Sequence, residues 1–150
     1  MHIGPYLRKG IVYVPTSRQI PGSYARDTEP VQVAPVSDMT AVMEAIERAI
    51  NSGNPPITEE EAVALPSWVT PSRTGVKSWS AFEKEMLSWA LGTDPKTGEY
   101  RMWAYEPFKG GGWVPSRMPV FTLPADTPLP ELIRCAAEVI CEAAKLQSLP

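Results

Sequence analysis

The sequence has one histidine and only two cysteines. The histidine, His2, stands beside the N-terminus, in a segment that we expect to be loose. We therefore do not expect a histidine general base, a Ser-His-Asp triad or a Cys-His pair. One histidine and two cysteines also cannot supply a zinc site with ordinary ligand spacing, so we expect no metal.

The two cysteines, Cys135 and Cys141, lie on one predicted helix. Their spacing puts them about 9 Å apart along its axis, which is too far for a disulfide between them. This fits a reducing compartment, and we expect Cys135 to be a small core residue. The sequence shows no secretory signal and no apolar run near the ~20 residues that cross a membrane, so we expect a cytoplasmic protein.

Excess charge of either sign is also missing, because the formal net charge is only −3. This balance disfavours general nucleic-acid binding and suits a cationic protein partner. The 43% of hydrophobic and 21% of charged residues are ordinary for a soluble globular domain. A chain of 150 residues predicts one domain, 1–150.

Two stretches of the chain, 11–53 and 99–147, have the same order of elements. Residues 11–37 align with 100–126 at an offset of 89 residues, and the helices that follow align after one inserted residue. Each stretch predicts two strands followed by a helix, and either duplication or convergence explains the likeness. The aligned residues are Gly22 with Gly111, Pro30-Val31 with Pro119-Val120, and Pro35 with Pro124.

The first unit predicts strands at 11–14 and 30–34, and a helix capped by Ser37 or Asp38 that ends near Gly53. The second predicts strands at 100–105 and 119–123, and a helix capped by Asp126 or Thr127. The apolar residues of the first helix have the three-four spacing of one buried stripe: Met39, Val42, Met43, Ile46 and Ile50.

Residues 54–98 predict a helical insertion between the two units. Thr58 with Glu61 has the spacing of a capping box, as does Ser80 with Glu83. The second of these pairs predicts a helix through Leu91, with an apolar stripe made of Phe82, Met86, Trp89 and Ala90. The whole predicts an α+β fold, an antiparallel sheet with the two unit helices on one face and the inserted helices beside them.

Candidate partner-binding residues come from two groups. The acidic run Glu59, Glu60 and Glu61 opens a predicted helix, where the helix dipole favours acids, and Asp94 lies in a polar turn. Either a solvated helix end or a partner contact explains the run. The aromatic residues Trp103, Tyr105 and Trp113 lie on or near turns of the second unit, whereas Trp79 and Trp89 are expected in the core.

The order of elements, together with Val76-Lys77-Ser78-Trp79-Ser80-Ala81-Phe82 and the turn Leu123-Pro124-Ala125-Asp126, resembles a known family. It is similar to the immunity proteins of bacterial contact-dependent growth inhibition systems. The resemblance implies binding to the toxic C-terminal domain of a cognate secreted effector, often a nuclease, whose active site is blocked in the cytoplasm. It implies neither enzymatic activity nor a cofactor.

Two other functions remain open. One is a small non-catalytic module that binds a ligand or serves as an adaptor, which a deep apolar pocket with converging polar groups would favour. The other is an enzyme that uses carboxylates alone, drawn from Asp94, Glu99 and Glu106. We expect a protein partner, no direct contact with nucleic acid or membrane, and a monomer.

Overall fold

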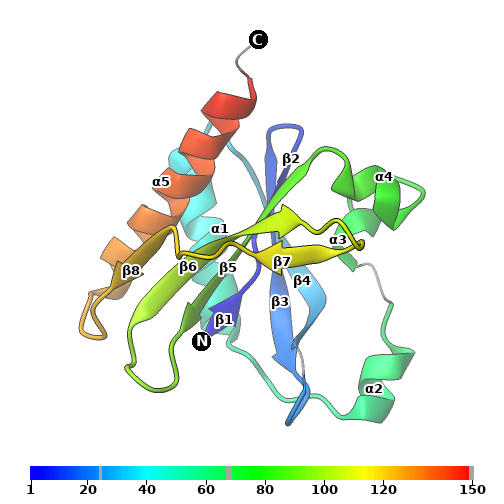
Figure 1. The fold of residues 1–150 in the computed structure, drawn as a ribbon, viewed down its shortest axis with the longest axis horizontal. Helices are drawn as coiled ribbons and strands as arrows, with labels where there is room; N and C mark the ends of the chain where they lie inside the picture. The colour runs from blue at the N-terminus through cyan, green and yellow to red at the C-terminus, as the bar shows by residue number, and fades with distance from the viewer. Residues whose placement is uncertain (24, 67–68, 149–150) are drawn as a thin grey trace.

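The computed structural model describes residues 1–23, 25–66 and 69–148, and it has an α+β fold (Figure 1). The described residues form one antiparallel sheet with the strand order β4-β3-β2-β5-β6-β7, while β1 pairs with β5 and β8 pairs with β6. The strands are β1 (His2–Ile3), β2 (Tyr6–Arg8), β3 (Ile11–Gln19), β4 (Ala25–Pro35), β5 (Met86–Thr93), β6 (Tyr100–Pro107), β7 (Trp113–Pro115) and β8 (Phe121–Leu123). The helices are α1 (Met39–Ser52), α2 (Glu59–Ala64), α3 (Val69–Ser72), α4 (Trp79–Glu83) and α5 (Leu129–Gln147).

The first predicted unit has the expected order, since β3 and β4 form a long hairpin and α1 follows. The hairpin register shifts between Pro15 and Thr16, so β4 carries extra residues at that point. Asp38 caps α1 by accepting the amide N–H of Ala41 at 3.0 Å, and Gly53 ends the helix with a φ of 68° that glycine adopts readily. The second unit has three strands, β6, β7 and β8, before α5.

The helix predicted from Ser80 to Leu91 is wrong beyond Glu83. The N-cap is Ser78, whose hydroxyl accepts the amide N–H of Ala81 at 3.2 Å, and α4 ends at Glu83. The chain then enters β5, which lies in the middle of the sheet between β2 and β6. Because β5 is buried on both faces, it lacks the alternation that marks a half-exposed strand, and its apolar spacing imitates a helix.

The N-terminal segment is not loose, because β1 and β2 both pair with β5. His2 lies opposite Gly92, and its backbone N–H donates to the side chain of Asn54 at 2.7 Å. Each of these strands has two or three residues, with Gly4 and Pro5 between them, so the sequence shows no recognisable run.

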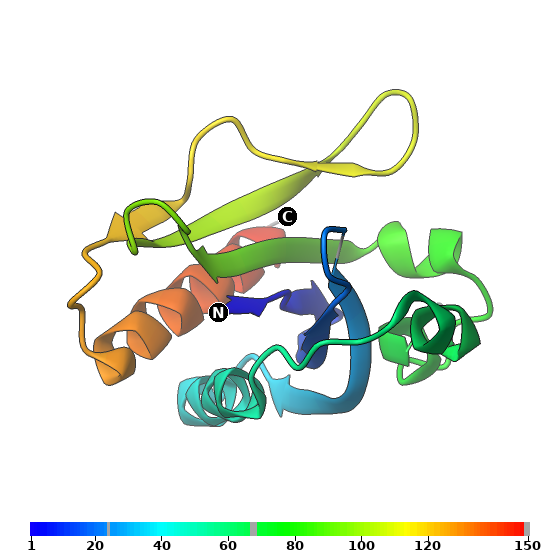
Figure 2. The same ribbon diagram turned by 90° about the horizontal axis from the view of Figure 1, so that it is seen from below.

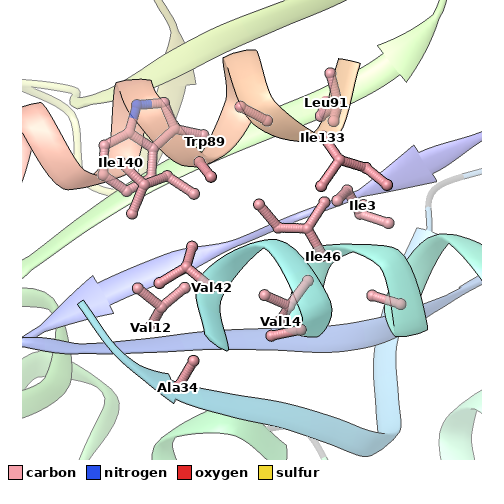
Figure 3. Close-up of a cluster of buried hydrophobic side chains, with 14 of the residues drawn as sticks. Ile3, Val12, Val14, Ala34, Val42, Ile46, Trp89, Leu91, Ile133 and Ile140 are labelled. Carbon is pink, nitrogen blue, oxygen red and sulfur yellow. The ribbon is translucent and has the colours of Figure 1, made fainter. Parts of the chain in front are cut away.

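The main core lies between the sheet and the two long helices α1 and α5 (Figure 3). The helices contribute Val42 and Ile46 from α1 and Ile133 and Ile140 from α5, all of them buried. The strands contribute Ile3, Leu7, Val12, Val14, Ala34, Trp89, Leu91 and Met102. The placement of both unit helices against this core, and of Trp89 within it, agrees with the sequence analysis.

The inserted helices lie away from α1 and α5, at the opposite side of the molecule in both ribbon views (Figure 2). They were expected beside the unit helices. Instead, Phe82 of α4 contacts the ring of Tyr6, which lies on the other face of the sheet from the core residue Leu7. Helix α2 covers a small separate cluster of Ile20, Ile57 and Ala62.

None of the helices in the described part of the chain is long and apolar enough to cross a membrane.

Candidate functional site

The sheet face that turns away from α1 and α5 carries the candidate site. Side chains alternate along a strand, so Tyr6 of β2 points away from the buried Leu7, and Tyr105 of β6 points away from the side of the buried Met102. The strand predicted at 100–105 is confirmed by β6. The face away from α1 and α5 therefore presents Arg101, Trp103 and Tyr105 from β6.

A pocket of about 200 Å³ opens on this face. Residues from strands at both edges of the sheet line this pocket, since they come from β2, β4, β5, β6 and β7, together with the first residue of α4. Its principal side chains are Tyr6, Asp27, Trp79, Ser88, Tyr105 and Trp113. Four of these six side chains are aromatic and one is a carboxylic acid, so the pocket offers ring surfaces and a site for one charge.

The acid of the pocket, Asp27, is bonded to Tyr6. The Tyr6 hydroxyl donates to Oδ2 of Asp27 at 2.6 Å. Burial raises the pKa of Asp27 to about 6, although the Tyr6 hydrogen bond and the charge of Arg26 act in the opposite direction. Burial, followed by the charge of Asp27, raises the pKa of Tyr6 well above its ordinary value. The tyrosine therefore stays a hydrogen-bond donor, and the carboxyl group changes its charge near neutral pH.

Glu83 holds two indole rings at the rim of the pocket. Oε1 of Glu83 accepts the Nε1–H of Trp113 at 2.8 Å, and it also accepts the Nε1–H of Trp79. These bonds join α4 to β7, across 30 residues of sequence in the case of Trp113. The fully buried ring of Phe82 supports the arrangement, with its centroid 5.5 Å from that of Trp79 and 5.7 Å from that of Tyr6.

Each of the two carboxylates keeps one oxygen without a protein partner in the described residues. Asp27 engages Oδ2 alone and Glu83 engages Oε1 alone, so Oδ1 and Oε2 are available to a ligand. A cation is the natural partner for such groups, since charge-assisted hydrogen bonds are stronger than neutral ones.

A second lobe of about 190 Å³ continues from the same Tyr6, Asp27 and Trp79 side chains towards α3. Thr70 lines this lobe and is only 1% exposed, yet its hydroxyl has no hydrogen-bond partner among the described residues. Arg26 also lines the lobe, but its guanidinium donates to the backbone oxygens of Ala62, at 2.8 Å, and Leu65. The buried Thr70 hydroxyl is therefore a polar group that lacks its partner.

On the other side the pocket meets a wider groove of about 830 Å³, between α4 with the start of β5 and the β6–β7 hairpin. Tyr105, Trp113 and Met86 belong to both the pocket and the groove. The charged residues that line the groove are Glu83, Lys84, Glu85 and Glu106, and Glu85 is paired with Arg8 at 2.9 Å and Lys9 at 3.2 Å.

The aromatic candidates predicted from the sequence partly come together. Tyr105 and Trp113 both line the pocket. Trp103 lies two residues before Tyr105 on the same face of β6, opposite Ala90 of β5, but it does not line the pocket. Its part in a larger contact surface stays a prediction.

The acidic candidates form no single patch. Glu59, Glu60 and Glu61 begin α2, whereas Asp94 lies in the β5–β6 turn at the other side of the molecule in both views. Two of these acids have structural partners. Glu61 completes the predicted capping box with Thr58, and Asp94 accepts the amide N–H groups of Lys96 and Thr97 and pairs with Arg101 at 2.7 Å.

Sequence reasoning missed Tyr6, Asp27 and Glu83, and it assigned Trp79 to the core. Trp79 is 38% exposed at the rim of the pocket. A signal was present for Asp27, because aspartate is disfavoured in strands and its place within the run Ala25-Arg26-Asp27-Thr28 needed a reason. No comparable signal marked Tyr6, whose strand was not recognised.

In the described part of the chain, no group of three or more histidine, cysteine, aspartate and glutamate side chains is arranged to hold a metal ion.

Comparison with known proteins identifies the fold and no more. No family model and no curated protein matches this sequence. Among solved structures, the chain is similar to a protein of unknown function, NMB0488 from Neisseria meningitidis, with a TM-score of 0.64 and 15% sequence identity. The match covers 95% of this chain and 93% of that one, so the two share their α+β architecture over nearly their whole lengths.

Proposed function

We propose that this chain is an immunity protein of a contact-dependent growth inhibition system. In this role it binds the toxin domain of the cognate effector, a nuclease in our proposal, and blocks its active site in the cytoplasm. The protein acts as a stoichiometric inhibitor and catalyses no reaction. It works as a monomer, without a cofactor and without contact to nucleic acid or membrane.

The observation that carries this proposal is the aromatic pocket at the edge of a wider groove. Tryptophan and tyrosine are enriched where proteins bind one another, since they supply a large contact area and a polar tip. Trp113 and Trp79 are fixed by Glu83, and Phe82 lies against Trp79, so the surface is already ordered before a partner arrives. Such order lowers the entropic cost of binding.

The alternative of a small-ligand module is less well supported by the size of the pocket. Sites for small molecules enclose roughly 300–1,000 Å³, and this pocket of about 200 Å³ with its second lobe of about 190 Å³ lies only at the lower end of that range. The larger groove is wide and lined by charged side chains. These dimensions suit one side chain of a protein and the segment that carries it.

The test is co-expression with the toxin domain encoded next to this gene. We expect cells that produce the toxin domain to grow when this chain is present and to die without it. The two proteins should also purify together as a complex with equal numbers of both chains. Death of the cells in the presence of this chain, with no complex surviving purification, would contradict the proposal.

A matched pair of variants tests where on this protein the toxin domain binds. Trp113→Ala removes an aromatic side chain from the pocket, and Glu47→Ala alters an exposed position on the outer side of α1. We expect the first variant to protect cells poorly and the second to protect them as well as the unaltered protein does. Equal protection by both variants would show that the toxin domain binds outside the pocket.

A further inference from the structure

We propose that the pocket receives one arginine side chain of the partner protein, whose guanidinium lies among the rings of Trp79, Tyr105 and Trp113 and pairs with Asp27. This inference rests on the proposed function and names the chemistry that the partner presents. The wider groove beside the pocket holds the segment on either side of that arginine.

The first argument is the ring surface. Cations bind to the faces of aromatic rings, tryptophan most strongly, and arginine does so more often than lysine because its guanidinium is flat and weakly hydrated. Tyr6, Trp79, Tyr105 and Trp113 all line the pocket. The indole N–H groups of both tryptophans donate to Glu83, so the ring faces are the parts that remain available to contact a cation.

The second argument is the hydrogen-bonding inventory. A guanidinium has five N–H donors and no acceptor, so it needs several acceptors around it. The free Oδ1 of Asp27 supplies one acceptor in the pocket, and the free Oε2 of Glu83 supplies another at its rim. The buried Thr70 hydroxyl, in the lobe that shares Asp27, supplies a third.

The third argument is the charge of the surroundings. Of the three glutamates of the groove, Glu85 pairs with Arg8 and Lys9, so Glu83 and Glu106 stand against one lysine, Lys84. The nearby Arg26 is tied to backbone oxygens rather than to Asp27. At the pocket itself an arriving cation therefore meets the carboxylates of Asp27 and Glu83, which favour a basic partner over an acidic one. Titratable groups around Asp27 include Tyr6, His2 and Tyr105, which also line the pocket.

The pocket is tested first without any toxin. Indole N–H signals of Trp79 and Trp113, assigned with Trp→Phe variants, are followed by NMR in the intact protein. The probes are N-acetyl-arginine methylamide and its neutral isostere, N-acetyl-citrulline methylamide, both at millimolar concentrations. We expect the arginine probe to shift both signals progressively and the citrulline probe to leave them in place. Equal shifts with both probes, or none with either, would overturn the inference.

Variants of the acid provide the control. Asp27→Asn has nearly the same shape but no charge, and we expect it to abolish the shifts caused by the arginine probe. Glu47→Gln removes one charge from the exposed face of α1 and should leave the shifts unchanged. If Asp27→Asn responds to the probe as the unaltered protein does, the carboxylate is not the counter-charge and the inference fails.

The toxin domain gives the second test. We expect Asp27→Asn to weaken its binding by at least about 30-fold in calorimetry, as is typical when one partner of a buried charge pair is removed. Full-strength binding by this variant would overturn the arginine inference and leave the proposed function standing. A toxin domain that does not bind the unaltered protein at all would instead overturn the proposed function, while the probe experiment still decides what the pocket accepts.

Discussion

Two carboxylates of the pocket, Asp27 and Glu83, are partly buried although each uses only one of its oxygens in hydrogen bonds within the described residues. Asp27 is half-buried and bonded to Tyr6, and burial disfavours the charged form of its carboxyl group. Glu83 uses one oxygen to hold two indoles, and its other oxygen has no partner among the described residues. Natural proteins often keep such costly groups where they bind something, because binding sites are selected for function and not for stability.

Asp27 should make the protein less stable as the pH rises. Its folded pKa of about 6 lies above the unfolded value of 3.8. The folded state therefore binds more protons, and stability falls between about pH 4 and pH 6 and is level above. A shift of roughly two units corresponds to at most about 3 kcal/mol. Urea unfolding between pH 4 and pH 8 measures this loss.

Asp27→Asn should remove this loss from the pH profile. Asp94, Glu61 and Glu99 have lowered pKa values and act in the opposite sense at lower pH, but they are the same in both proteins. The difference between the two profiles therefore isolates Asp27. Parallel profiles across the whole range would show that the carboxyl group titrates normally.

Glu83→Ala should loosen the junction between α4 and β7. The variant removes the shared acceptor of Trp79 and Trp113. Hydrogen bonds to charged groups contribute about 1.5–3 kcal/mol when buried, and Glu83 is only half-buried, so we expect a loss of about 1–2 kcal/mol. Urea unfolding measures it, and faster hydrogen exchange in β7 should accompany it. Unchanged exchange in β7 would mean that the strand is held by its pairing with β6 alone.

At the scale of elements, the sequence predicts what local chemistry controls. Met39, Val42, Ile46 and their neighbours mark α1 because one face of that helix is buried and the other is exposed. The β6 alternation is visible for the same reason. The prediction of a helix for the segment with Trp89 and Leu91 is wrong. Because β5 is covered on both faces, its residues do not alternate between apolar and polar. Only its pairing with β2 and β6 decides that this segment is a strand.

Of the candidate site, only Tyr105 and Trp113 are predictable from the sequence. Trp113 and Tyr105 stand beside recognisable turns, so their exposure follows from the sequence. Asp27 and Tyr6 form a site only because the fold brings β4 and β2 together, and their hydrogen bond joins residues that are 21 positions apart in the sequence. Long-range contacts of this kind leave no periodic trace in a single sequence.

Helix α2 depends on its capping box. Thr58 accepts the amide N–H of Glu61 at 3.1 Å, and the carboxylate of Glu61 accepts the amide N–H of Thr58 at 2.9 Å. Thr58→Ala should cost about 1 kcal/mol of local stability, whereas Thr58→Ser keeps the hydroxyl and should cost far less. Amide exchange at Ala62 and Leu65 reports on this helix. Equal exchange in the two variants would show that the cap contributes nothing.

At the scale of the whole molecule, the core between the sheet and the two long helices carries the stability. Leu91 is fully buried in the central strand. Leu91→Ala should cost about 2–5 kcal/mol because it removes buried methyl groups and leaves a cavity. Val63 of α2 is 84% exposed, and Val63→Ala should change stability by less than about 0.5 kcal/mol. Chemical denaturation measures the free energy of unfolding of both variants. A small loss for Leu91→Ala would mean that neighbouring core side chains repack into the cavity.

The place of β5 in the sheet also sets the order in which a nascent chain can fold. Its two edges are taken by strands that come before it and after it, β2 on one side and β6 on the other. Until residues 86–93 have left the ribosome, the early hairpin of β2 and β3 has an open edge, and such edges pair readily with foreign strands. Synthesis of the later half therefore protects the earlier half from aggregation.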